Sequence, residues 1–169
     1  MANGGNAIDG AAVVQFVLSV VQPQSMGIGG GCLVLYYDAA TEKMYALDGR
    51  EEAPAAFSGR QFCKNNDCML NPKCDCSNGT VEISDRQTGG HSNGVPGAVY
   101  ATARLLQDFG TISLAQALQP AIEIARNGFP MYSGLYNSIV SHADRLVDFP
   151  ASVKLFLKPG TLTPIVEIG

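Results

Sequence analysis

The hydrophobic pattern predicts a first helix over residues 7–21, because apolar residues recur there at helical spacing. Asn6 precedes the pattern as an N-cap, Asp9 suits the positive end of the helix dipole, and Pro23 follows as a stop. Small residues at positions 7, 10, 11 and 14 would let one face lie close to a sheet. Since positions 8, 12, 16 and 20 are also apolar, we expect the helix to be buried on most sides.

Strand-type residues at 32–38 and 43–48, joined by a short turn, predict an antiparallel β-hairpin. A glycine-rich loop with four glycines in residues 27–31 precedes the hairpin and excludes ordinary helix or strand there. The loop follows a helix and leads into a strand, whereas a dinucleotide-binding loop follows a strand and opens a helix. We therefore interpret it as a tight backbone path between layers, or as backbone that approaches a bound ligand.

Two amphipathic helices are predicted in the second half of the chain. The first covers residues 98–109 and ends at Gly110, and the second opens with a capping box of Ser113 and Gln116 and ends at residues 127–128. Pro120 predicts a kink or the start of a second segment. Residues 135–147 are a candidate for a further helix, and the proline-containing tail after residue 149 predicts no element. Helices together with a hairpin indicate an α+β fold.

Residues 58–93 differ from the rest of the chain, because they are polar and have few apolar residues to form a core. We interpret residues 1–169 as a partial single domain with a cysteine-rich insertion at about 58–93. Four of the five cysteines lie in this insertion: Cys63, Cys68, Cys74 and Cys76.

The chemistry of these four cysteines has two interpretations. Disulfides would stabilise a segment that cannot bury apolar area, and four cysteines allow three pairings. Zinc is the alternative, with His91 as a further ligand, but the cysteine spacing is not a standard zinc pattern. The sequence favours disulfides and an exported protein. Asn78 begins a glycosylation sequon in the same insertion, which agrees with export. We expect the fifth cysteine, Cys32, to be a small buried hydrophobic residue.

Composition and charge exclude several classes of protein. The chain is 46% hydrophobic and 15% charged, which is too apolar for a disordered protein and too sparsely charged for a coiled coil. The net charge of -4 and the lack of a basic stripe argue against nucleic-acid binding. No run approaches the roughly 18 apolar residues of a membrane span. The N-terminal residues do not resemble a signal peptide, so a targeting segment would lie outside this sequence.

Arg50 and Glu51 are the most informative charged pair, because they follow a predicted strand at a place where a pocket can open. A guanidinium binds a carboxylate through two parallel hydrogen bonds, and the neighbouring carboxylate could accept an α-amino group. The alternative is a surface or interdomain ion pair. The two histidines, His91 and His142, lie in no recognisable nucleophile–base pattern, and we expect both to be exposed or hydrogen-bonded.

Several motifs, taken in order along the chain, resemble the large subunit of γ-glutamyltranspeptidases. They are residues 4–12 (GGNAIDGAA), 23–31 (PQSMGIGGG), 46–54 (ALDGREEAP), 94–97 (GVPG), 119–122 (QPAI) and 126–130 (RNGFP). The resemblance covers residues 3 to about 145 and fades after residue 149.

The resemblance implies an N-terminal-nucleophile hydrolase, a four-layer αββα sandwich built from two subunits of one self-cleaved precursor. In that family, the N-terminal threonine of the small subunit attacks the γ-glutamyl amide of glutathione, and the acyl group passes to water or to an amino acid or peptide. The arginine of the large-subunit motif, which corresponds to Arg50, holds the substrate α-carboxylate. Glu51 follows it and is expected to shape the γ-glutamyl pocket.

From this resemblance we expect a large-subunit fragment that contains no nucleophile, binds no metal or cofactor, and acts with the small subunit on glutathione or another γ-glutamyl compound. The expected location is extracellular or at the cell surface, with vacuolar or periplasmic locations as alternatives. The alternative function is a non-catalytic degenerate paralogue or a cysteine-rich exported binding module.

Overall fold

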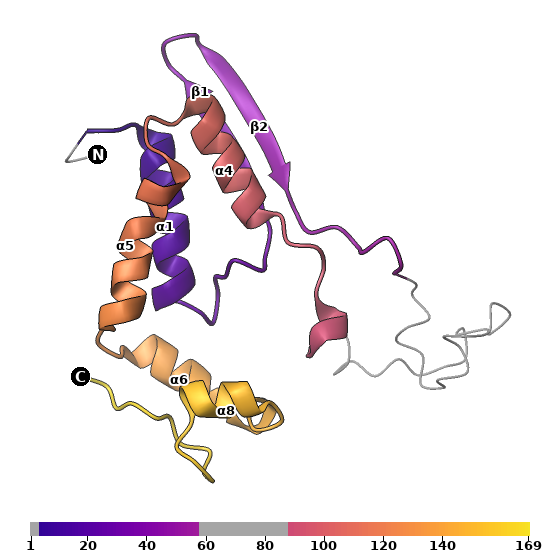
Figure 1. Ribbon diagram of the computed structural model, residues 1–169, viewed down its shortest axis with the longest axis vertical. Helices are drawn as coiled ribbons and strands as arrows, with labels where there is room; N and C mark the ends of the chain where they lie inside the picture. The colour runs from indigo at the N-terminus through magenta and orange to yellow at the C-terminus, as the bar shows by residue number, and fades with distance from the viewer. Residues whose placement is uncertain (1–3, 58–87) are drawn as a thin grey trace, which may run out of the picture. The chain divides into compact units, whose positions relative to one another are not determined.

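The computed structural model describes residues 4–57 and 88–169, and the chain divides into two compact units (Figure 1). One unit comprises the residues up to Gly27 and those from Leu105 onward, and the other comprises Ile28–Arg104. The four cysteines of the predicted insertion and Asn78 lie outside the described residues, so their predicted disulfides and glycosylation stay predictions. No helix within the described ranges is long and apolar enough to cross a membrane.

The first unit is built on two helices that lie side by side, α1 (Ala7–Val21) and α5 (Leu114–Asn127) (Figure 1). The buried apolar residues of these helices are Ile8, Ala12 and Phe16 in α1 and Ala117 and Ala121 in α5. Because alanines occupy most of these positions, the two backbones can approach closely. Within this chain, burial on most sides of α1 is a wrong prediction. Ala7, Ala11 and Val14 are exposed.

The predicted N-cap of α1 and the predicted capping box of α5 are both present, and in α1 Asn6 and Asp9 also form a capping box. The Asn6 side chain accepts from the backbone of Ile8 and Asp9, and the Asp9 carboxylate accepts from the Asn6 backbone N–H. Ser113 and Gln116 cap the start of α5 in the same reciprocal way. The helix continues as one element through Pro120 and ends at Gly128, whose φ of 79° suits a glycine.

Asp9 does more than cap α1, because its buried carboxylate also binds the loop before α5. It accepts hydrogen bonds from the Thr111 backbone at 2.7 Å, the Thr111 hydroxyl at 2.6 Å and the Ile112 backbone at 3.2 Å. Burial raises the pKa of this carboxyl, but the hydrogen bonds from Thr111, Asn6 and Ile112 together lower it from 3.8 to about 2. The charged form of Asp9 therefore joins the start of α1 to the start of α5.

We expect Thr111→Val to destabilise the fold at neutral pH and to make its stability depend less on acid. A carboxyl whose pKa is lower in the folded chain than in the unfolded chain stabilises the fold above the unfolded value. That contribution, about 2 kcal/mol here, is lost as the pH falls from 3.8 to about 2. Removing the hydroxyl raises the folded pKa of Asp9, so the variant should be less stable at neutral pH and the difference should vanish near pH 2. Denaturant midpoints between pH 2 and 7 test this, and a constant difference at all pH values would contradict it.

The C-terminal part of the first unit forms a small core. The predicted helix over 135–147 is instead two helices, α6 (Ser133–Ser141) and α7 (Ala143–Leu146), because the backbone of His142 leaves helical geometry between them. The tail adds α8 (Pro150–Phe156), which the sequence did not predict. The buried residues of this core are Leu135, Ile139, Ala143 and Leu157.

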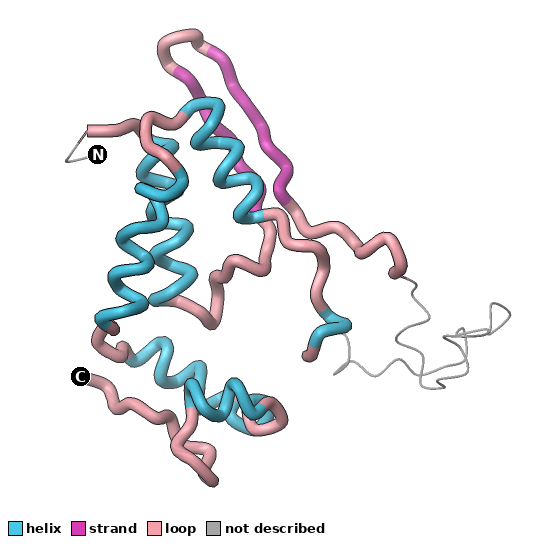
Figure 2. The backbone as a smooth tube through the Cα atoms, in the orientation of Figure 1, coloured by secondary structure: helices cyan, strands magenta, loops and turns pink. Residues whose placement is uncertain are grey.

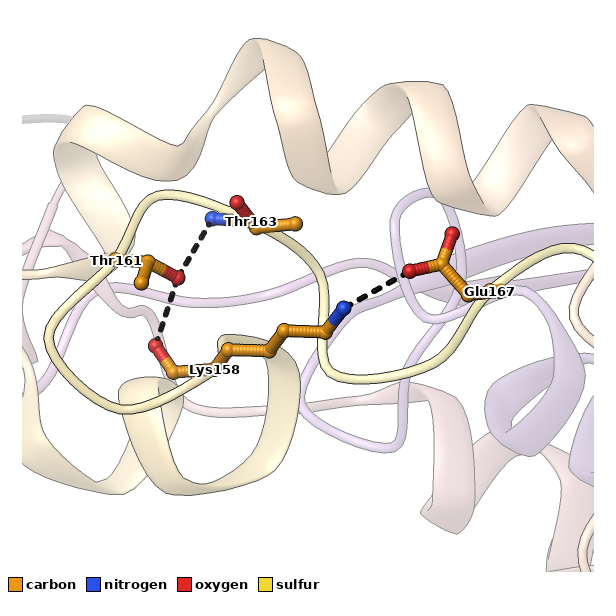
Figure 3. Close-up of polar contacts among 4 residues, drawn as sticks. All are labelled: Lys158, Thr161, Thr163 and Glu167. Atoms are coloured by element: carbon orange, nitrogen blue, oxygen red, sulfur yellow. Dashed lines mark hydrogen bonds and ion pairs between the residues drawn. The ribbon is translucent and has the colours of Figure 1, made fainter.

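After α8 the chain folds back on itself, as Figure 3 shows. Lys158 Nζ lies 2.9 Å from Glu167 Oε1, and the Lys158 carbonyl accepts a hydrogen bond from the Thr161 hydroxyl at 3.0 Å. The same hydroxyl accepts from the Thr163 backbone N–H at 3.2 Å. These contacts close the turn that places Pro164 opposite Leu157 in the core.

The second unit contains the predicted antiparallel hairpin of β1 (Cys32–Asp38) and β2 (Lys43–Gly49) (Figure 2). On one face Tyr36 stacks on Tyr45 with ring centroids 6.2 Å apart. The opposite face is exposed and carries Leu33, Leu35, Tyr37 and Met44. The unit also includes a short 3-10 helix, η3 (Gly90–Ser92), and the first residues of α4 (Ala98–Phe109). The helix and hairpin elements confirm a mixed α and β structure.

Candidate functional site

Three segments of the second unit meet where β2 ends. The Gly30 carbonyl accepts hydrogen bonds from the backbone N–H groups of Gly97 and Ala98, at 3.1 and 3.0 Å. Glu52 and Val95 pair as an isolated antiparallel bridge, with Val95 N donating to Glu52 O at 2.8 Å. The glycine-rich loop, the end of β2 and the start of α4 are therefore tied together through backbone groups. This agrees with the interpretation of the loop as a tight backbone path.

Close backbone approach explains the glycine at the end of β2. Gly49 is buried, and a Cβ built on it would lie 2.5 Å from the Ala101 Cβ and 3.3 Å from Cys32 Sγ. Any larger residue at position 49 would separate the hairpin from the first turn of α4. The strand end that carries Arg50 is thus fixed against a helix.

Arg50 and Glu51 leave β2 side by side and form an ion pair, with Arg50 Nη2 3.1 Å from Glu51 Oε2. The Arg50 side chain is 60% exposed, whereas that of Glu51 is 28% exposed. The backbone N–H of Arg50 donates to Asp48 Oδ1 at 2.9 Å, which fixes the turn out of the strand. The Arg50 guanidinium is therefore open to solvent, and its ion pair is with the less exposed carboxylate of Glu51. Such a guanidinium can bind an incoming carboxylate.

Cys32 lies near this pair but has the properties of a structural thiol. It is a free cysteine, partly buried rather than fully buried as predicted. Burial raises the pKa of its thiol, although the positive charge of Arg50 lowers it. A thiol with a raised pKa is protonated at neutral pH and is a poor nucleophile.

His142 contacts a serine, but the geometry does not activate that serine. Its Nδ1 lies 2.8 Å from the Ser138 carbonyl oxygen and 3.1 Å from Ser141 Oγ. A carbonyl only accepts hydrogen bonds, so the contact with Ser138 requires the proton on Nδ1, and this nitrogen cannot then act as a base. The expectation of an exposed, hydrogen-bonded His142 is confirmed. The side chain of His91 is outside the described part of the chain, as are the cysteines of the zinc alternative.

The sequence analysis did not predict which residues surround the Glu51 side chain. Its carboxylate lies against the backbone of Gly31, and its Cβ lies against Gly94, from a segment more than 40 residues away. The glycine-rich loop signalled a close approach, but no sequence pattern indicated that Glu51 was the group it approaches.

Comparisons with known proteins place the whole chain in one family. Residues 1–168 match the family model described as gamma-glutamyltranspeptidase. The glutathione hydrolase proenzyme of Bacillus subtilis (strain 168) is 36% identical over 143 residues, which are 85% of this chain and 22% of that protein. The acylase ACY 1 proenzyme of Pseudomonas sp. (strain SE83) is 33% identical over 159 residues, which are 93% of this chain and 27% of that protein. The chain thus spans about a quarter of the length of these relatives.

Solved structures agree with the sequence comparisons. The crystal structure of Helicobacter pylori gamma-glutamyltranspeptidase has a TM-score of 0.84 and 30% identity, and the match covers 99% of this chain and 44% of that chain. The gamma-glutamyltranspeptidase from Pseudomonas nitroreducens complexed with L-DON has a TM-score of 0.78 and 29% identity, with 96% and 44% covered. The expected fading after residue 149 is wrong, because both kinds of match include the tail. The chain belongs to the gamma-glutamyltranspeptidase family.

Proposed function

We propose that this chain is the N-terminal part of the large subunit of a γ-glutamyltransferase or glutathione hydrolase. The complete precursor, meaning the full protein that would contain this chain and a small subunit, would cleave the γ-glutamyl amide of glutathione. It would pass the acyl group to water, an amino acid or a peptide. The observation that carries the proposal is the exposed guanidinium of Arg50, anchored at the end of β2 in a chain of this family.

In the proposed reaction, Arg50 binds the α-carboxylate of the γ-glutamyl group. Two parallel hydrogen bonds to a carboxylate fix both its position and its plane. The scissile carbonyl is at the other end of the same short acyl group, so fixing the carboxylate also orients the carbonyl toward a nucleophile. Glu51 holds the guanidinium through the ion pair and contributes negative charge that suits an α-ammonium group.

The covalent step would come from the small subunit. Its threonine oxygen would form an ester with the γ-carbonyl carbon, the amine would leave with a proton, and an acceptor would then take the acyl group. The exposed apolar face of the hairpin supports a second layer over this chain, because Leu33 and Leu35 are 71% and 77% exposed. We propose that this face packs within a four-layer αββα sandwich. We also propose that the complete protein is located outside the cell or at its surface.

A second candidate is an acylase, for which we propose acyl substrates that lack the α-amino group. The 33% identity to a protein named acylase favours it. Glutaryl and γ-glutamyl anilides separate the two candidates, because both have the terminal carboxylate and only the second has the α-amino group. Faster turnover of the glutaryl anilide would favour the acylase.

The isolated 169-residue chain should not turn over γ-glutamyl 4-nitroanilide. Covalent catalysis needs a positioned nucleophile with a base, and the Ser141–His142 contact does not supply one. Release of nitroaniline is the measurement, with the complete precursor as the active control. Turnover by the purified chain above the rate in buffer would contradict the prediction.

A further inference from the structure

The position of the Glu51 carboxylate depends on the absence of a side chain at Gly31. A Cβ built on Gly31 would lie 2.6 Å from Glu51 Oε2, 2.7 Å from the Gly49 carbonyl oxygen and 2.8 Å from the Arg50 Cα. Ordinary van der Waals contacts of a Cβ begin at 3.4 Å. A methyl group at position 31 would therefore displace the carboxylate that pairs with Arg50 and press on the backbone that carries both residues.

Gly94 encloses the same side chain at its base. A Cβ at position 94 would lie 2.9 Å from the Glu51 Cβ and 3.1 Å from the Glu52 carbonyl oxygen. Neither Gly31 nor Gly94 has a positive φ, so alanine could adopt the backbone conformation at both positions. What these positions require is space for the Glu51 side chain and for the backbone of residues 49, 50 and 52, not glycine's conformational freedom.

We propose that Gly31 and Gly94 are positioning residues for the substrate-binding Arg50. They enclose the Glu51 side chain from two separate segments. The 3.1 Å ion pair with Glu51 then fixes where the Arg50 guanidinium lies. Since Glu51 is only 28% exposed while Arg50 is 60% exposed, the enclosed carboxylate restrains the open guanidinium. The inference deepens the proposed function and rests on it. Small displacements of a group that positions the substrate can reduce kcat/KM by large factors.

The test is Gly31→Ala and, separately, Gly94→Ala in the complete precursor, assayed with γ-glutamyl 4-nitroanilide. Each variant should raise KM about tenfold, with a smaller change in kcat, because both displace a group that holds the substrate rather than the nucleophile. Gly29→Ala is the matched control, since a Cβ at position 29 meets nothing within 4 Å and Gly29 has no positive φ. Its KM should equal that of the unmodified enzyme.

A double variant separates positioning from general loss of structure. If Gly31 acts through Arg50, then Gly31→Ala combined with Arg50→Lys should raise KM no further than Arg50→Lys alone. If the two effects multiply, Gly31 acts independently and the inference is overturned. The Gly94→Ala and Arg50→Lys combination gives the same test from the other segment.

The remaining outcomes are also decisive. An unchanged KM in both alanine variants, with Arg50→Lys impaired, overturns this inference and leaves the proposed function standing. An unchanged KM in Arg50→Lys overturns the proposed function and this inference with it. If both alanine variants fail to yield folded, processed enzyme, the glycines have a purely structural role and the inference is overturned. If only one variant folds, its KM decides.

Discussion

Arg50→Lys in the complete precursor is expected to raise KM for glutathione about ten- to a hundredfold. Lysine keeps the positive charge, but its ammonium group cannot reproduce the planar pair of hydrogen bonds to a carboxylate. One charge-assisted hydrogen bond contributes roughly 1.5–3 kcal/mol, which corresponds to the expected loss of affinity. Because the carboxylate is held in both the substrate and the transition state, the change should fall mainly on KM. A smaller loss of kcat follows if the carbonyl is misplaced.

Steady-state kinetics on processed, folded enzyme measure this effect. Arg126→Lys is the matched control, since Arg126 is an exposed arginine in the last turn of α5. Its KM should not change. An unchanged KM in Arg50→Lys would mean that Arg50 and Glu51 form only a surface ion pair.

Asp9→Asn is expected to destabilise the fold by about 3 kcal/mol. The Asp9 carboxylate accepts hydrogen bonds from Asn6, Thr111 and Ile112, and its side chain is buried. Asparagine has one acceptor oxygen, and its amide group would face N–H donors that are left without a partner. A buried donor without a partner costs about 1–3 kcal/mol, and hydrogen bonds to a charge are stronger than neutral ones.

The measurement is the denaturant midpoint of the variant and the unmodified protein at pH 7. Asp148→Asn provides the control, because Asp148 is exposed in the turn before α8. The control should unfold at the same denaturant concentration as the unmodified protein. Equal midpoints for Asp9→Asn would show that the carboxylate does not hold α1 to the loop before α5.

Local signals predicted the elements whose ends are fixed by nearby residues. Two capping boxes form through contacts within three residues, Asn6 with Asp9 and Ser113 with Gln116. The starts of α1 and α5 could therefore be predicted from the sequence. The hairpin followed from strand-type residues on both sides of a short turn, and its antiparallel pairing and strand bounds agree to within one residue. These features depend on local chemistry, which a sequence displays directly.

Features that depend on distant contacts were missed. The favourable position of Asp9 near the start of α1 was predicted, but its hydrogen bonds to Thr111 join residues 102 positions apart. Helix α8 begins with Pro150 at its first turn, where proline is tolerated, and its partly buried Val153 and Phe156 pack against the core around Leu135. Proline therefore indicated a break where the structure has a helix start.

The candidate site was predicted in part. The motif and its place after a strand identified Arg50 and Glu51, and the structure shows them as an ion pair. The close packing of Gly31 and Gly94 around Glu51 could not be predicted from the sequence. It depends on how three separate segments meet, and a glycine does not indicate which group will occupy the space that it leaves.

The role of Arg50 is tested most directly by two substrates that differ only in the α-carboxylate. The complete precursor should cleave γ-glutamyl 4-nitroanilide with a kcat/KM at least about a hundredfold higher than for 4-aminobutyryl 4-nitroanilide, because an arginine site left without its carboxylate rejects the analogue. In Arg50→Lys this preference should shrink about tenfold or more, since the loss affects only the substrate that has the carboxylate. A preference that is equally large in the variant would contradict the assignment of Arg50 as the carboxylate-binding group.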